Sequence, residues 1–204
     1  MVRDVLIAYN DSDTESSRRF FQDCADKIRQ KSFDIGLVHH MMDSAELTVE
    51  SVERHIRECS EHFIFSAFSH GSKTSLYNDR QDDYISVARG NNYIFSGNIV
   101  YTFACECGYD LKEDLESKKV ASFWGYKGKV AMVFCDEFVE CATKGIELLL
   151  EKKTLKEAKT GMLDKYDECI SRLRFRAPIK AAYLLDNKEK LVVTGRDDLT
   201  IDDL

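Results

Sequence analysis

The chain has 204 residues and a formal net charge of −7 at pH 7, with 44% hydrophobic and 32% charged residues. This composition is globular and excludes an intrinsically disordered chain, and the length suits one domain over residues 1–204. No apolar run approaches the roughly 20 residues of a membrane-spanning helix, and no secretory signal follows Arg3 and Asp4. We therefore expect a soluble cytoplasmic protein with no membrane contact, and the acidic charge argues against nucleic-acid binding.

The first 70 residues alternate between strand-like and helix-like patterns. Residues 4–9 form an apolar run that predicts a buried strand, and Asp13 or Thr14 caps a helix extending to about residue 30. A short strand is predicted over residues 33–39 and a helix over residues 44–61 with Ser44 as its cap. Residues 63–69 then predict a third buried strand that ends at His70-Gly71.

The polar residues 71–97 interrupt this alternation, with a helical stretch expected around Tyr84 to Ala88. A strand over residues 98–104, a helix over 110–118 and a strand over 120–124 follow. Residues 136–173 have helical spacing, broken near Thr154 and at Gly161. After Pro178 we expect a hairpin with arms at residues 179–185 and 191–194. Strands that alternate with helices predict a three-layer α/β/α sandwich with a mainly parallel central sheet.

Two of the predicted strands end abruptly in a chemically reactive side chain. Residues 63–69 lead into His70-Gly71, and residues 98–104 lead into Cys105. Binding sites in parallel sheets form beyond the carboxyl ends of the strands, so both side chains are expected at one edge. A thiol nucleophile with a histidine acid–base partner would result.

The order of these motifs resembles the caspase-like clan of cysteine peptidases, and within it the bacterial CHAT branch. Ala104-Cys105-Glu106-Cys107-Gly108 is similar to the Ala-Cys-Glu-(Thr/Ser)-Gly of that branch, and residues 120–124 are similar to its next strand. The resemblance covers about residues 63–170 and implies a caspase-like fold. It also implies that His70 and Cys105 are catalytic and that the backbone N–H groups of Gly71 and Cys105 form the oxyanion hole.

Several features of the expected site stay open. Cys107 is a spectator, a redox partner of Cys105 or the nucleophile itself, and a zinc site of His70, Cys105 and Cys107 lacks a fourth ligand. We expect no metal and no cofactor. Phe103 stands where some arginine- or lysine-specific relatives carry an aspartate, so cleavage preference is undetermined. Acidic residues of the polar segment (Asp79, Asp82 and Asp83) or basic ones (Arg80 and Arg89) are candidates for substrate contacts.

The remaining cysteines and histidines have no comparable context. We expect Cys24, Cys59, Cys135, Cys141 and Cys169 to be core or surface thiols, all reduced, because an odd count of seven fits no disulfide framework. We expect His39, His40, His55 and His62 to be structural or solvated.

The resemblance implies a protein substrate and a regulatory protein partner, because so short a chain has no room for a sensor domain. Bacterial relatives suggest, by analogy, a role in antiviral defence. Two other functions remain open: a non-catalytic adaptor with the caspase-like fold, and a TIR-like or flavodoxin-like nucleotide-binding domain. The opening residues 4–13 resemble a TIR domain, but the turn Asn10 to Asp13 lacks a phosphate-binding glycine loop.

Overall fold

A six-stranded sheet forms the centre of the computed structural model, which describes residues 1–204. Its strand order is β2-β1-β3-β7-β8-β9, and every neighbouring pair is parallel except β8 and β9. The strands are β1 (Asp4–Tyr9), β2 (Val38–Met42), β3 (Phe63–Phe68), β7 (Ile99–Phe103), β8 (Ser122–Tyr126) and β9 (Leu191–Gly195). The predicted mainly parallel sheet is confirmed.

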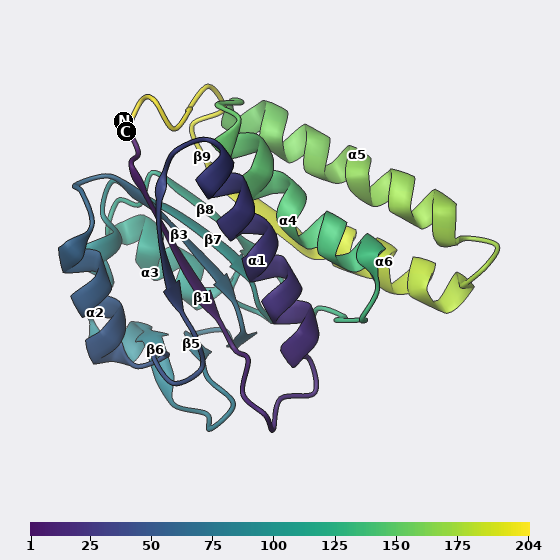
Figure 1. Ribbon diagram of the computed structural model, residues 1–204, viewed down its shortest axis with the longest axis horizontal. Coiled ribbons are helices and arrows are strands. Elements are labelled where there is room, and N and C mark those ends of the chain that lie inside the picture. The colour runs from purple at the N-terminus through teal and green to yellow at the C-terminus, as the bar shows by residue number, and fades with distance from the viewer.

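Helices cover both faces of this sheet (Figure 1). One face packs against α1 (Arg18–Asp34), α4 (Asp136–Leu150), α5 (Leu155–Leu173) and α6 (Pro178–Lys190), which share a core of 32 buried residues with the strands. The other face packs against α2 (Val49–Glu58) and α3 (Asp110–Ser117) around a second core of 18 buried residues. The structure is therefore the predicted α/β/α sandwich, with β3 and β7 buried along their whole length.

Residues 71–97 form a small antiparallel sheet rather than the expected loop with a helix. Its strands are β4 (His70–Gly71), β5 (Ser75–Tyr77) and β6 (Asp83–Ser86), in that order. Tyr84 and Ile85 lie in β6, and only short 3₁₀ turns follow, η1 (Val87–Arg89) and η2 (Asn92–Phe95). Leu76, Tyr84 and Ile85 are buried in the second core, which explains why this polar segment has ordered strands.

The first arm of the predicted C-terminal hairpin is wrong, because residues 178–190 form helix α6. Pro178 occupies the first turn, where its missing N–H costs nothing, and Ala181, Leu184 and Asn187 are buried at helical spacing. Asn187, which the hairpin prediction placed between the two arms, lies in this helix instead. Its side chain accepts from the Ala131 N–H and donates to Ala131 O, both at 2.8 Å. The second arm is strand β9, which pairs with β8 instead.

Two boundaries near the N-terminus also differ from prediction. Helix α1 continues to Asp34 and thus includes Phe33, so the second strand begins only at Val38. Helix α2 begins at Val49, where the Thr48 hydroxyl accepts from the Ser51 N–H at 3.2 Å, rather than at a Ser44 cap. Where the sequence carries no strong start or stop signal, the ends of an amphipathic helix lie a few residues from their predicted positions.

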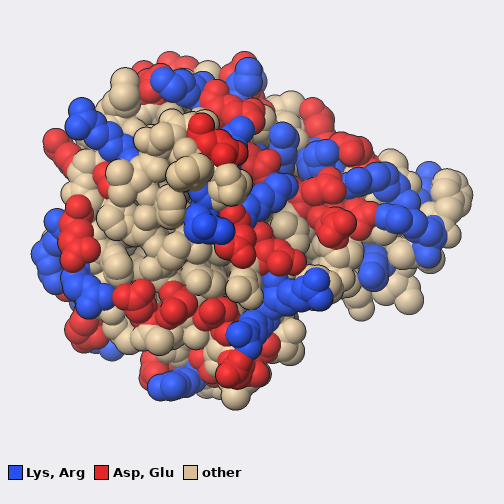
Figure 2. Space-filling view, in the orientation of Figure 1, with Lys and Arg blue, Asp and Glu red and all other residues tan.

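The two chain termini lie side by side, joined by a hydrogen bond from Val2 N–H to Ile201 O of 3.1 Å (Figure 1). Acidic and basic side chains are interspersed over the face shown in Figure 2. None of the helices is both long and apolar enough to cross a membrane.

Candidate active site

His70 and Cys105 both follow strands of the central sheet directly. Phe68 ends β3 and Phe103 ends β7, and these two residues pair in the parallel register. Because β3 and β7 are neighbours, the segments that leave them emerge side by side at the carboxyl edge of the sheet.

Glycine at position 71 allows the two segments to touch. A Cβ atom at Gly71 would lie 2.7 Å from the backbone oxygen of Cys105 and 2.9 Å from the Ala104 Cβ. Real side-chain atoms do not approach so closely, so only glycine permits this contact without a shift of the backbone. The structure thus brings the segment of His70 and Gly71 into contact with the segment of Cys105.

The ring of His70 is held on three sides. Its Nε2 lies 2.5 Å from the Glu15 carboxylate, Tyr77 stacks on it with ring centroids 5.5 Å apart, and Phe21 meets it edge-on. Glu15 belongs to the segment that leaves β1, the neighbour of β3, and its side chain is only 6% exposed. The Ser17 N–H donates to the same carboxylate at 2.6 Å and fixes its position.

Glu15 is the residue that the sequence analysis missed. The available signal was its place in the polar segment after β1, at the same carboxyl edge as His70. Because strand order is not legible from sequence, that signal did not distinguish Glu15 from Asp11 or Asp13. A carboxylate on one nitrogen of an imidazole orients the ring.

Cys105 is partly buried and its thiol accepts from the Val130 N–H, with an N-to-S distance of 3.4 Å. Burial raises the pKa of Cys105, while the Val130 N–H opposes this effect and the Glu106 carboxylate adds to it. In the ligand-free protein the sulfur is therefore protonated at neutral pH. A proton acceptor is required before it can act as a nucleophile.

The backbone around Cys105 offers hydrogen-bond donors. The Cys105 N–H has no hydrogen-bond partner. In the β4–β5 pair, Ser72 N–H donates to Ser75 O, so the alternation of an antiparallel ladder turns the N–H of Gly71 away from β5. Glu106 adopts the left-handed conformation, with φ 58°, and turns the chain sharply after Cys105.

Cys107 occupies a different environment from Cys105. Its side chain is fully buried, its sulfur lies 3.0 Å from the Thr102 hydroxyl, and its thiol donates to Ala104 O. Burial raises the pKa of Cys107 to about 11. A buried neutral thiol of this kind packs as a small apolar side chain.

The charged residues of the polar segment are only partly available to a substrate. Asp79 accepts from the hydroxyls of Ser12 at 2.7 Å and Thr14 at 2.8 Å, and so ties this segment to the one carrying Glu15. Asp82, Asp83, Arg80 and Arg89 make no ion pair.

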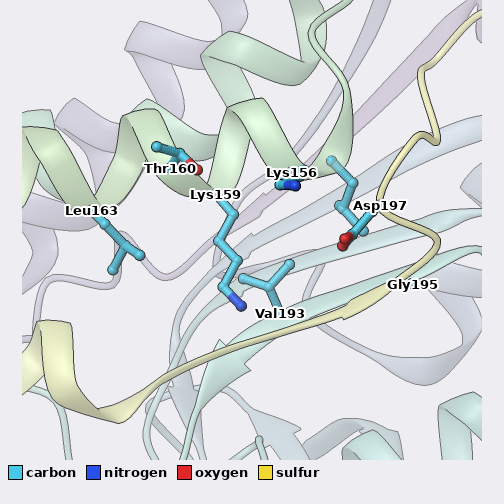
Figure 3. Close-up of a pocket in the computed structure, with 8 residues that line it drawn as sticks. Lys156, Lys159, Thr160, Leu163, Val193, Gly195 and Asp197 are labelled. Atoms are coloured by element: carbon cyan, nitrogen blue, oxygen red, sulfur yellow. The ribbon is translucent and has the colours of Figure 1, made fainter.

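A separate pocket of about 280 Å³ lies between α5 and the sheet edge at β9 (Figure 3). Its lining includes Lys159, Leu163 and Val193, and the Lys159 side chain reaches from α5 toward Val193. None of its lining residues belongs to the segment around Cys105. The pocket is therefore distinct from the candidate active site.

The sheet order, the parallel register and the two helical layers define a caspase-like fold. The structure is similar to that of the Arg-specific cysteine proteinase gingipain R (RgpB), with a TM-score of 0.70 and 10% sequence identity over 98% of this chain. A complex of the RgpB pro- and mature domains from Porphyromonas gingivalis gives a TM-score of 0.60, with 13% identity over 97% of this chain.

This chain spans about half the length of those solved structures, 47% and 48% respectively. No protein family and no curated protein matches the sequence. At such low identity the similarity establishes the fold alone.

Proposed function

We propose that this protein is a cysteine endopeptidase that hydrolyses peptide bonds of a protein substrate through Cys105 and His70. The observation that carries the proposal is the close packing of Gly71 against Cys105, which holds the segments of His70 and Cys105 against each other at the carboxyl edge of a caspase-like sheet. The Glu15 carboxylate on Nε2 supports it further, because an oriented imidazole is what proton transfer requires.

The proposed reaction begins with transfer of the Cys105 thiol proton to His70. The sulfur then attacks the peptide carbonyl, and the carbonyl π electrons move to oxygen, which accepts from the N–H groups of Gly71 and Cys105. His70 gives its proton to the departing amine as the C–N bond breaks, leaving an acyl-enzyme. Water, deprotonated by His70, releases the acid and restores the thiol.

The similarity of Ala104-Cys105-Glu106-Cys107-Gly108 to the CHAT motif supports a proposed place in that branch. We also propose, by analogy with the relatives that this motif resembles, that a regulatory protein partner controls activity. A role in bacterial antiviral defence is proposed by analogy with such relatives.

Labelling with peptidyl electrophiles tests the assignment. Probes with Arg, Lys, Asp, Asn or Leu before the reactive group are incubated with wild type, Cys105→Ala, Cys107→Ala and His70→Ala, and adducts are measured by intact mass. We expect one adduct that disappears in Cys105→Ala, weakens at least about 100-fold in rate in His70→Ala and persists in Cys107→Ala. The reactive probe then indicates the cleavage preference.

Equal labelling of all four proteins would contradict the proposal, because it would identify an ordinary exposed thiol. Absence of any adduct, with small iodoacetamide still reaching Cys105, would leave two functions: an enzyme that needs its regulatory partner, or the alternative of a non-catalytic interaction module with the caspase-like fold.

A further inference from the structure

A second cluster of reactive side chains lies at the opposite end of the sheet from Cys105. Asp4 begins β1, His40 lies in β2 and Cys59 follows the last residue of α2. One ligand atom from each of these residues lies within 4.8 Å of the others. His40 pairs with Leu6, so strand alternation places Asp4, Leu6 and His40 on the face that α2 covers.

His40 belongs to a second such group, with His55 and Glu58 of α2. The rings of His40 and His55 have centroids 6.2 Å apart and planes inclined at 67°. His55 precedes Cys59 by four residues, so the two side chains leave the end of α2 on the same side. Imidazole, thiol and carboxylate donors from three elements therefore converge on His40.

Two of these groups lack hydrogen-bond partners, and the third is an anion without a Lys or Arg counter-charge. The Asp4 carboxylate, 10% exposed, has no Lys or Arg within ion-pair distance; it accepts from the N–H and the hydroxyl of Ser60 and lies 3.1 Å from His40 Nε2. The Cys59 thiol makes no hydrogen bond, and the buried Nδ1 of His55 has no hydrogen-bond partner. A buried anion, a free thiol and an unpaired imidazole nitrogen together are the environment that a cation would satisfy.

We propose that this cluster binds a divalent transition-metal ion of the Zn²⁺ class through Asp4, His40, Cys59 and His55. Zinc accepts carboxylate, imidazole and thiolate donors in tetrahedral geometry, and its bond lengths space those donors roughly 3.3–3.8 Å apart. Donor atoms of Asp4, His40 and Cys59 lie within 4.8 Å of one another, and the His55 donor lies within 4.8 Å of that of His40, so modest shifts of the side chains bring the four donors to that spacing. The thiol proton of Cys59 passes to solvent when the metal–sulfur bond forms.

Neighbouring side chains are placed to orient these ligands. Glu46 lies 3.3 Å from Nε2 of His55, which leaves Nδ1 of that ring for the metal. The Ser60 N–H donates to Asp4 at 3.0 Å. Hydrogen bonds of this kind fix the ring tautomer and the ligand direction in metal sites. Because four protein donors fill the coordination sphere, the ion would join β1, β2 and α2 rather than perform catalysis.

Cobalt titration of the full chain tests the site, since Co²⁺ substitutes for Zn²⁺ and reports its ligands by absorption. The protein, kept reduced and first stripped with a chelator, is titrated as wild type, His40→Ala and Cys59→Ser. Matched controls are His39→Ala, on the opposite face of β2, and Cys135→Ser, a partly exposed thiol near α4. Competition with Zn²⁺ then measures the affinity for zinc.

We expect one ion per chain, with tetrahedral ligand-field bands and a thiolate-to-cobalt charge-transfer band. Both variants of the cluster should lose more than about 100-fold in affinity, and both controls should bind as wild type does. Zinc should also raise the thermal midpoint of wild type and leave that of Cys59→Ser unchanged. If Cys59→Ser fails to fold, His55→Gln replaces it, with the same expected loss.

Three results would overturn the proposal. One is a cobalt spectrum without the charge-transfer band. Another is equal affinity in wild type and Cys59→Ser, or in wild type and His55→Gln where that variant replaces it. Cys105→Ala and His70→Ala are titrated alongside, and the third result is binding that is lost only in these two variants, which would move the ion to the candidate active site.

Discussion

The orientation of His70 determines which of its nitrogens can act in the proposed reaction. The Glu15 carboxylate is hydrogen-bonded to Nε2, and the rings of Tyr77 and Phe21 restrict rotation of the imidazole. Nδ1 is then the nitrogen left to exchange a proton with the thiol or the departing amine. Glu15 is therefore a positioning residue in the proposed mechanism, since it acts through His70.

Replacing the charge at Glu15 should weaken proton transfer while leaving the fold intact. We expect Glu15→Gln to slow labelling of Cys105 by a peptidyl electrophile at least about tenfold, a part of the 10²–10⁴-fold contribution of general acid–base catalysis. The amide keeps a hydrogen bond to Nε2 but no longer stabilises the imidazolium. Intact-mass kinetics measure the rate, with Asp13→Asn in the same exposed segment as the control. Equal rates in both variants would remove Glu15 from the mechanism.

The reactivity of Cys105 toward a small reagent should depend strongly on pH. Burial raises the pKa of Cys105 above the ordinary thiol value of 9.0, so the thiolate fraction of the free protein increases as the pH rises toward and beyond 9. We expect the rate of alkylation by iodoacetamide to increase steadily between pH 6 and 9, about tenfold per pH unit. Peptide-level mass spectrometry of Cys105 follows the rate. A pH-independent plateau near neutrality would instead reveal a preformed thiolate–imidazolium pair.

Chain order and strand ends were enough to predict that the segments carrying His70 and Cys105 leave the sheet at one edge, while their catalytic roles stay a prediction. His70 and Cys105 each follow an apolar run whose length and ending are visible in the sequence. Glu15 was not predictable, because its contact with His70 spans 55 residues and depends on β1 lying beside β3. The same limitation applied to His40, His55 and Cys59, whose proximity depends on the packing of α2.

At the scale of elements, the contact between β4 and the end of β7 should tolerate no added atom. A Cβ at Gly71 would meet backbone and Ala104 atoms that cannot move independently of the sheet. We expect Gly71→Ala to lower the free energy of unfolding by about 1–3 kcal/mol and to reduce labelling of Cys105. Urea denaturation measures the first effect.

Gly161→Ala provides the control for this substitution. Gly161 lies in α5, and the nearest atom to its added Cβ is the end of the flexible Leu148 side chain. Alanine also has the higher helix propensity, by about 1 kcal/mol. We expect Gly161→Ala to leave labelling unchanged. If Gly71→Ala folds and reacts as wild type does, the close packing is not needed for the site.

The C-terminal elements show where local sequence ceased to be informative. Residues 179–185 have an apolar pattern compatible with either a strand or a helix, and a turn-forming triplet at 186–188 favoured the hairpin. The choice depends on tertiary contacts: Asn187 satisfies the backbone of Ala131, and Leu184 enters the core beside α5. Intrinsic secondary-structure propensity determines the conformation of such a segment only where tertiary packing does not.

At the scale of the whole molecule, the alternating pattern was sufficient to predict the layers of the fold but not the strand order. β9, near the end of the chain, pairs antiparallel with β8 and forms one edge of the sheet. The candidate active site lies at the carboxyl ends of the strands, and the proposed metal site lies at the amino end of β1. Long-range pairing of this kind leaves no signature in a single sequence.

Hydrogen-bonded carboxylates distributed over the surface should make the molecule sensitive to acid. The Lys31 ammonium lowers the pKa of Glu151, Thr154 at the start of α5 lowers that of Glu157, and the Ser12 hydroxyl lowers that of Asp79. A carboxylate whose pKa is lowered by folding stabilises the native state above its unfolded pKa. That contribution to stability is lost as the pH falls through the pKa that the group has in the folded state.

The ordinary pKa values are 4.5 for Glu and 3.8 for Asp. The free energy of unfolding should therefore stay level above about pH 5.5 and decline below about pH 4.5. Urea denaturation at a series of pH values measures this free energy. Glu157→Gln, which removes one such group, should reduce the slope of the decline, whereas Glu61→Gln, at a group with no ion pair or side-chain hydrogen bond, should leave it as in wild type. Stability that rises on acidification would show that carboxylate repulsion, rather than these hydrogen bonds, governs the acid response.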